Sequence, residues 1–258
     1  MRVLTAYQTD VGNQKDTNED SLCIQVAETD RGIAIFAAVC DGMGGLSKGE
    51  LASATVIRAL EAWFEEDFPA LLGHVELEDE IRYQWDRIIK EQNRLIGAYG
   101  RAQSVHIGTT LTAMLILEDR LFIGHVGDTR AYRLDGEGIR QLTEDHTVVN
   151  QKIQHGQMTQ DEAEGDARRH MLLQCIGASK VLTPDFVFDR VRPGECYLLC
   201  SDGFPDKITT EEMAQTLAPD TLVDEAVMEA KLRTLIDMDM QRGEEDNITA
   251  IMIKLEEG

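Results

Sequence analysis

Positive charge is scarce in this sequence. The chain has 25 lysine and arginine residues against 47 aspartate and glutamate residues, and its formal net charge at pH 7 is −22. Proteins that bind nucleic acid use clustered lysine and arginine to neutralise the phosphate backbone, so no nucleic-acid partner is expected. Most of the surplus acids, such as those in residues 61–67, fit a solvated helix face and need no functional explanation.

Long hydrophobic runs are also absent. The longest purely apolar run, Ile33–Cys40, is far too short to cross a bilayer. The segment Met1–Gln8 has no apolar signal core. The sequence therefore predicts no membrane segment and a cytoplasmic location.

The five cysteines form no Cys-x-x-Cys pair, which disfavours a zinc cluster or a dithiol redox site. All but Cys175 lie in apolar, strand-like runs, so they are predicted to be reduced core residues. No repeat, low-complexity tract or Pro/Gly/Ser linker divides the chain. With 43% hydrophobic residues it is expected to fold as one domain over residues 1–258.

Short runs rich in valine, isoleucine, leucine and aromatic residues recur along the chain and predict β-strands. Glu118-Asp119 and Asp135-Gly136 join pairs of these runs at separations suited to tight hairpins, which predicts antiparallel sheets. The predicted strands are Ser21–Ala27, Ile33–Cys40, Thr109–Leu117, Arg120–Val126, Arg130–Leu134, Phe186–Val191, Cys196–Cys200 and Ile248–Leu255.

Helices are predicted between groups of strands. Ser47 and Glu50 form a capping box at the start of a first helix, whose apolar face includes Val56 and Leu60. A second amphipathic stretch carries Ile81, Trp85, Ile88, Leu95 and Tyr99.

The C-terminal part of the chain predicts a short helix capped by Thr209 and Glu212. A longer helix is predicted around Val223, Val227, Ala230 and Thr234. Two antiparallel sheet layers covered by helices use all of these apolar faces, so the predicted fold class is α+β. The polar, strand-poor segment 145–181 is expected to form a partly helical flap on the surface, with Thr159 and Glu162 as another capping box.

Aspartates repeatedly stand at the ends of apolar runs. An aspartate beside a glycine also fits an ordinary turn, and this reading holds for any one position. In antiparallel sheets, however, an acid after one strand and an acid before its neighbour lie at the same edge, so five carboxylates can converge there. The five are Asp20, Asp41, Asp128, Asp202 and Asp246.

Converging carboxylates repel one another unless cations are supplied, and their hard oxygen ligands select Mg²⁺ or Mn²⁺. Two such ions that share a carboxylate lower the pKa of a bridging water and clamp a phosphoryl group for in-line attack. Phosphate-ester hydrolysis is the use of such a centre that the sequence favours.

Signatures of other phosphate chemistries are missing. No Cys-x5-Arg loop is present for a cysteine nucleophile, and the glycine-rich run Gly42–Lys48 lacks the Gly-Lys-Ser/Thr ending of a P-loop. That run also lacks the dinucleotide-binding spacing. Its glycines are interpreted as allowing the backbone to approach a metal closely.

The ordered set of motifs resembles the metal-dependent protein phosphatases of type 2C in their compact bacterial form, over nearly the entire chain. The residues that carry the resemblance are Lys15-Asp16-Thr17-Asn18-Glu19-Asp20-Ser21, Asp41-Gly42-Met43-Gly44-Gly45, Gly108-Thr109-Thr110, Val126-Gly127-Asp128-Thr129-Arg130, Asp145-His146, Cys200-Ser201-Asp202-Gly203 and Glu245-Asp246-Asn247.

The resemblance implies a four-layer α-β-β-α sandwich with a dinuclear Mn²⁺ or Mg²⁺ centre in a cleft at one end. It implies that Asp41 bridges both ions, that Asp20 and the Gly42 carbonyl help to hold one, and that Asp202 and Asp246 hold the other. A third ion is implied at Asp128 together with Asp202, and Glu19 is implied to act through metal-bound water. His146 and His170 of the flap are expected to be structural.

Two positions depart from the family pattern. Lys15 stands where most relatives place an arginine that grips the substrate phosphate, so it keeps the charge and loses the bidentate fork. Met43 stands where many eukaryotic relatives carry a histidine proposed to protonate the leaving oxygen, so water is expected to fill that role. The implied catalytic residues are Asp41, Asp20 and Lys15.

The function implied by the resemblance is hydrolysis of phosphoserine and phosphothreonine in proteins by a metal-bridging hydroxide, opposing a bacterial serine/threonine kinase. Two alternatives stay open at this point. Lys15 and the acidic surface also fit a catalytically weak module that binds phosphoproteins. The same metal site also fits a hydrolase of small phosphate esters.

Overall fold

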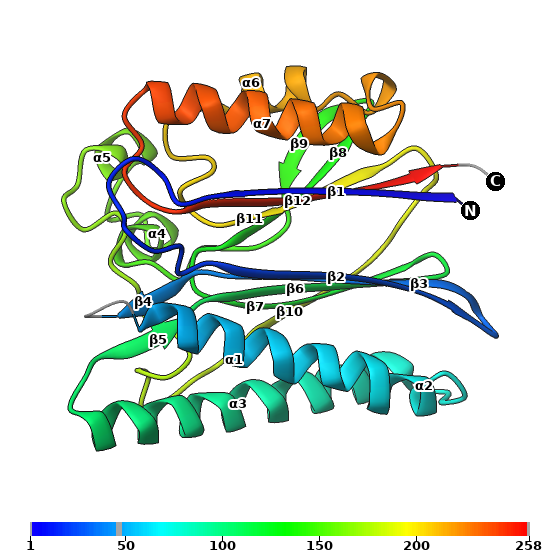
Figure 1. Ribbon diagram of the computed structural model, residues 1–258, viewed down its shortest axis with the longest axis horizontal. Helices are drawn as coiled ribbons and strands as arrows, with labels where there is room; N and C mark the ends of the chain where they lie inside the picture. The colour runs from blue at the N-terminus through cyan, green and yellow to red at the C-terminus, as the bar shows by residue number, and fades with distance from the viewer. Residues whose placement is uncertain (1, 45–47, 257–258) are drawn as a thin grey trace.

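The computed structural model describes residues 2–44 and 48–256, and in it two antiparallel sheets stack face to face (Figure 1). Helices cover the outer face of each sheet, with α6 and α7 on one side and α1 to α3 on the other (Figure 1). The predicted α+β class and the four-layer order of helix, sheet, sheet and helix are confirmed.

The first sheet has the strand order β1-β12-β11-β8-β9, and the second has the order β10-β7-β6-β3-β2. A short pair, β4 with β5, lies beside the second sheet. All neighbouring strands pair antiparallel. The bounds are β1 Arg2–Asp10, β2 Ser21–Thr29, β3 Gly32–Cys40, β4 Gly42–Gly44, β5 Ile107–Thr109, β6 Leu111–Leu117, β7 Arg120–Val126, β8 Arg130–Asp135, β9 Gly138–Gln141, β10 Asp185–Arg190, β11 Cys196–Cys200 and β12 Ile248–Glu256.

The predicted strand Thr109–Leu117 was wrong in one respect, because the structure divides it into β5 and β6. Thr110 separates them, and its backbone N–H donates to the carbonyl of Asp41. The strand β1 was missed, since only Leu4 and Ala6 of it are buried and its pattern is therefore weak.

The strand β3 shows how the sequence builds the layers. Successive side chains of a strand point to opposite faces, so Ile35 and Val39 pack between the sheets while Phe36 and Ala38 pack against the helices. All are fully buried, which explains the unbroken apolar run. Phe36 contacts the rings of Trp63 and Trp85, and truncating a buried aromatic side chain of this kind costs about 3–5 kcal/mol.

The helices on the second sheet are α1 Gly49–Ala62, η1 Trp63–Asp67, α2 Phe68–Leu71 and α3 Leu77–Gln103. Of the capping box predicted for α1, Ser47 lies outside the described residues. The apolar face predicted for α3 was wrong in its second half, because Leu95 and Tyr99 are exposed. There the helix instead turns Gly97 toward the loop at Gly177. A Cβ at Gly97 would lie 2.8 Å from the carbonyl oxygen of Gly177.

The first sheet is covered by α6 Thr210–Thr216, η2 Pro219–Thr221 and α7 Glu225–Gln241. The capping box of Thr209 and Glu212 is confirmed at the start of α6. The predicted helix is α7, but Val223 lies before it, and Ala230 and Thr234 are exposed. The buried face of α7 is formed instead by Met228, Leu232, Leu235 and Ile236.

The segment 145–181 holds α4 Val148–Gln154 and α5 Gln160–Glu164, and the capping box of Thr159 and Glu162 is confirmed in α5. Both helices lie at one end of the sandwich (Figure 1). Isolated bridges from Thr147 to Leu172 and from Thr109 to Ile176 fix the segment to itself and to β5. None of the described helices has the length and hydropathy needed to cross a membrane.

Candidate metal centre

The five strand-end aspartates converge. Antiparallel pairing brings three of them to one edge of the second sheet and two to one edge of the first, and the stacking of the sheets brings the two groups together. Asp20 precedes β2 and Asp246 precedes β12, whereas Asp41, Asp128 and Asp202 follow β3, β7 and β11. Burial raises the pKa of Asp41 well above its ordinary value, and the charges of the other four aspartates raise it further. Carboxylates that perturb one another in this way form one cluster.

Positive charge from Lys15 and Arg130 compensates this cluster only in part. Burial raises the pKa of Asp20 to about 7, and the carboxylates of Asp202 and Asp246 add to the shift although Ser201 Oγ donates to Asp20 Oδ2 at 2.8 Å. Oδ1 of Asp20 and Oδ1 of Asp202 are buried and accept no hydrogen bond from the described residues. Buried, unpaired carboxylate oxygens are the donor set that Mg²⁺ and Mn²⁺ bind, so the residues fit such ions.

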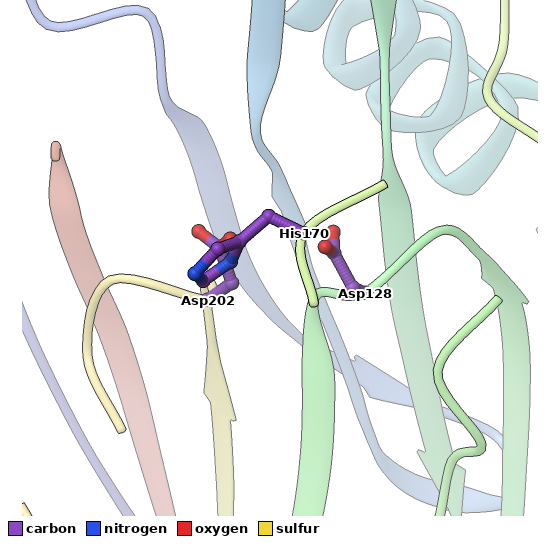
Figure 2. Close-up of side chains that lie close together, drawn as sticks. All are labelled: Asp128, His170 and Asp202. Atoms are coloured by element: carbon purple, nitrogen blue, oxygen red, sulfur yellow. The ribbon is translucent and has the colours of Figure 1, made fainter. Parts of the chain in front are cut away.

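Asp128, Asp202 and His170 form the tightest part of the cluster. One ligand atom from each residue lies within 4.8 Å of the other two (Figure 2). His170 Nδ1 lies 3.2 Å from Asp202 Oδ2, and this contact raises the pKa of His170. The same contact, together with Asp41, lowers the pKa of Asp202 against the effect of burial.

His170 was expected to be structural, but its side chain lies in the aspartate cluster, in contact with Asp202. It reaches the cluster from the flap, 32 residues before Asp202 in the chain. The expectation holds for His146, whose Nδ1 accepts from the Gly127 N–H at 3.0 Å and whose Nε2 lies 3.0 Å from Asp185.

Lys15 lies at the rim of the cluster. Its Nζ is 2.9 Å from Asp246 Oδ1, and its side chain is 42% exposed. Burial lowers its pKa, but Asp246, Asp41 and Glu19 outweigh this and raise it overall. Lys15 lines a cavity of about 460 Å³ together with His170, Asp202 and Asp246. A cation here faces both the carboxylates and any anion that enters the cavity.

Glu19 and Gly42 pack against the start of α1, next to the cluster. Glu19 Oε1 accepts from the backbone N–H of Gly49 at 2.8 Å, at the start of α1, and its carbonyl accepts from Gly42 N–H at 3.2 Å. A Cβ at Gly42 would lie 2.3 Å from the Gly49 carbonyl oxygen and 2.5 Å from that of Glu19. Close backbone packing thus requires Gly42, and its predicted role as a carbonyl ligand stays a prediction.

The family model described as Protein phosphatase 2C matches residues 12–241. The chain belongs to this family. A serine/threonine phosphatase of Listeria monocytogenes is 31% identical over 96% of this chain and 94% of its own length. The recognition of the phosphatase family and the expected class of enzyme, a phosphoprotein phosphatase, are confirmed at the level of the family.

Solved structures agree with the type 2C fold. The Mycobacterium tuberculosis serine/threonine phosphatase PstP/Ppp superposes with a TM-score of 0.82 and 31% identity, covering 99% of both chains. The catalytic domain of a serine/threonine phosphatase PstP in complex with two manganese ions gives a TM-score of 0.79 and 28% identity, again over 99% of both chains.

In this type 2C chain an ion pair joins the flap to the sheet beside Asp128. Arg130 Nη2 lies 2.6 Å from Asp145 Oδ2, and Arg130 Nε contacts both oxygens of Asp145. Asp145 is the first residue of the flap, so the pair fixes the start of the flap to β8. The sequence contained both residues within its motifs but gave no sign of their contact.

Proposed function

We propose that this chain is a protein serine/threonine phosphatase that uses two divalent ions, Mn²⁺ or Mg²⁺, to hydrolyse phosphoserine and phosphothreonine. The observation that carries the proposal is the cluster of five aspartates, two of which, Asp20 and Asp202, have a buried oxygen that accepts no hydrogen bond from the described residues. The names of the relatives support the substrate class, and the manganese complex of one relative supports the metal.

The proposed ligands follow the arrangement of the cluster. Asp41 is the proposed ligand of both ions, as the family resemblance implies, and it lies among the other four aspartates. Asp20 and the carbonyl of Gly42 hold one ion, and Asp202 and Asp246 hold the other. Asp128, next to Asp202 and His170, is the proposed site of a third ion. Glu19 is proposed to act through metal-bound water.

When bound, the ions supply Lewis-acid polarisation of the phosphoryl group and an activated water. The protein contributes orientation. Ser201 Oγ fixes Asp20 by donating to its Oδ2. Ser201 Oγ in turn accepts from the backbone N–H of Thr249. Lys15 attracts the phosphate as a point charge, because ammonium lacks the planar fork of a guanidinium.

Further features of the proposal rest on the sequence. We propose one catalytic domain over residues 1–258 with its flap at 145–181, and a cognate serine/threonine kinase as functional partner. A cytoplasmic location is supported by the cysteines, which are all buried and free of disulfides.

Hydrolysis of a phosphothreonine peptide tests the proposal. Phosphate release is measured with Mn²⁺, with Mg²⁺ and with EDTA, using the wild-type protein and Asp202→Ala. We expect release that needs metal and is lost in the variant. Turnover of small phosphate esters without turnover of peptide supports the small-ester hydrolase, whereas peptide binding without release under either metal supports the binding module.

A further inference from the structure

A second cavity continues from the metal centre beneath the flap. It has a volume of about 720 Å³ and shares Asp128, Asp202 and His170 with the centre. Its walls come from α4 and α5 of the flap and from the segment that links β11 to α6. This cavity, which we call the flap groove, therefore borders the place that the proposed function gives to the substrate phosphate.

The cationic side chains of the flap groove already have anionic partners. Arg130 makes its two-pronged contact with Asp145. Arg169 Nη2 lies 2.9 Å from Asp206 Oδ2. Lys207 Nζ bonds to the same oxygen and lies 3.8 Å from Glu244 Oε2. These three charges are thus compensated within the protein and are poorly placed to attract an acidic substrate.

Two acids of the groove have no such partner. Glu164 is the last residue of α5, and Glu211 lies in the first turn of α6. Both are exposed, and both line the groove. Within residues 2–44 and 48–256, no lysine, arginine or histidine nitrogen lies within 4.0 Å of either carboxylate. The groove therefore presents uncompensated negative charge from the flap and from α6.

The groove also has an apolar lining. Val149 and Ile153 come from α4, Ala163 comes from α5, and Pro205 and Ile208 come from the segment after β11. Lysine and arginine bury their aliphatic stems on such surfaces while their charged ends reach polar partners. An apolar lining together with two free carboxylates is complementary to a long basic side chain.

We propose that the flap groove binds a lysine or arginine side chain of the phosphoprotein substrate, near the phosphorylated residue in sequence. The proposal rests on the proposed phosphatase function and adds to it a preference for phosphorylated sites with basic neighbours. Glu164 and Glu211 are the residues that set this preference.

Matched phosphothreonine peptides test the preference. A lysine is placed at each position from about three residues before to about three residues after the phosphothreonine, since an extended chain spans ~3.3 Å per residue. The reference peptide carries glutamine at the same positions. We expect the best lysine peptide to have a kcat/KM roughly 5–10-fold above the reference at low salt, and this ratio to fall as salt is added.

The double variant Glu164→Gln with Glu211→Gln assigns the effect. We expect it to reduce the ratio to within about 2-fold of one through a higher KM for the lysine peptide, because only the charge of the groove has changed. Hydrolysis of a small aryl phosphate should stay as in the wild type. Glu66→Gln with Glu229→Gln is the matched control, since both residues are exposed and lie outside the groove. This control should keep the ratio.

The outcomes separate the two levels of the proposal. Equal rates for lysine and glutamine peptides in an active wild-type enzyme overturn the preference and leave the phosphatase function intact. A preference that survives in the double variant, or that the control variant also loses, overturns the role of Glu164 and Glu211. Absence of metal-dependent hydrolysis for every substrate, aryl phosphate included, overturns the proposed function and the preference with it.

Discussion

Substituting Asp239 by asparagine should stabilise the protein at alkaline pH. Asp239 lies on α7 and is fully buried. Its Oδ1 accepts the backbone N–H of Lys207 at 2.8 Å, but its buried Oδ2 accepts no hydrogen bond from the described residues. Burial, with the charges of Glu244 and Asp206, raises its pKa from 3.8 to about 7.

The direction in which stability changes with pH follows from the linkage between proton binding and folding. A carboxyl group whose pKa is higher in the folded state binds its proton more tightly there, so stability falls as pH rises from the unfolded to the folded pKa. Between about pH 5.5 and about pH 8.5 a folded pKa near 7 removes ~2 kcal/mol from the wild type, at 1.36 kcal/mol per pKa unit. Asparagine keeps the acceptor for Lys207 and does not titrate.

The assay is chemical denaturation of wild type and Asp239→Asn in EDTA at both pH values. At the higher pH, the free energy of unfolding of the variant should rise by ~2 kcal/mol relative to wild type. In thermal denaturation this corresponds to roughly 4–8 °C in Tm for a chain of this size. Asp220→Asn, an exposed substitution of the same type, should show no such change. A stability difference for Asp239→Asn that is the same at both pH values would refute the reasoning.

Two further predictions concern the metal centre. Lys15→Arg should lower KM for a phosphopeptide by roughly 2–5-fold, because the guanidinium fork binds phosphate through two donors; an unchanged or higher KM contradicts this. Gly42→Ala should destabilise the protein by at least ~2 kcal/mol in denaturation, because its Cβ would lie 2.3 Å from the Gly49 carbonyl oxygen. Gly73→Ala, where nothing lies within 4 Å of the added Cβ, is the control, and equal effects of the two substitutions count against the packing argument.

The sequence predicted the positions of the clustered aspartates better than it predicted the contacts of the flap and the buried face of α3. Hydrophobic runs and tight turns were enough to locate β7 and β11 to the residue. Antiparallel pairing then placed Asp41 and Asp128 at one edge of the second sheet, and Asp202 and Asp246 at one edge of the first. This step needs only the direction of each strand. Bringing the two edges together also needs the stacking of the two sheets, which strand pairing alone does not give.

Contacts across the flap could not be predicted in the same way. His170 meets Asp202 because α4, α5 and the turns around them fold back over the edge of the sheet, and no local pattern encodes that path. Leu95 and Tyr99 look like core residues by spacing, but α3 buries glycine where it meets Gly177. A prediction from the spacing of apolar residues therefore misses this part of α3, where the contact is made by glycine.

The most direct test of the central claim is a calorimetric titration of Mn²⁺ into metal-free wild type and Asp41→Asn. The account predicts at least two ions bound per wild-type chain, since Asp41 lies among four other aspartates. It predicts loss of at least one of these ions in the variant, with a weaker or absent rise of Tm on adding metal. Binding of fewer than two ions to wild type, or the same stoichiometry and affinity in Asp41→Asn, would contradict a dinuclear centre built on these carboxylates.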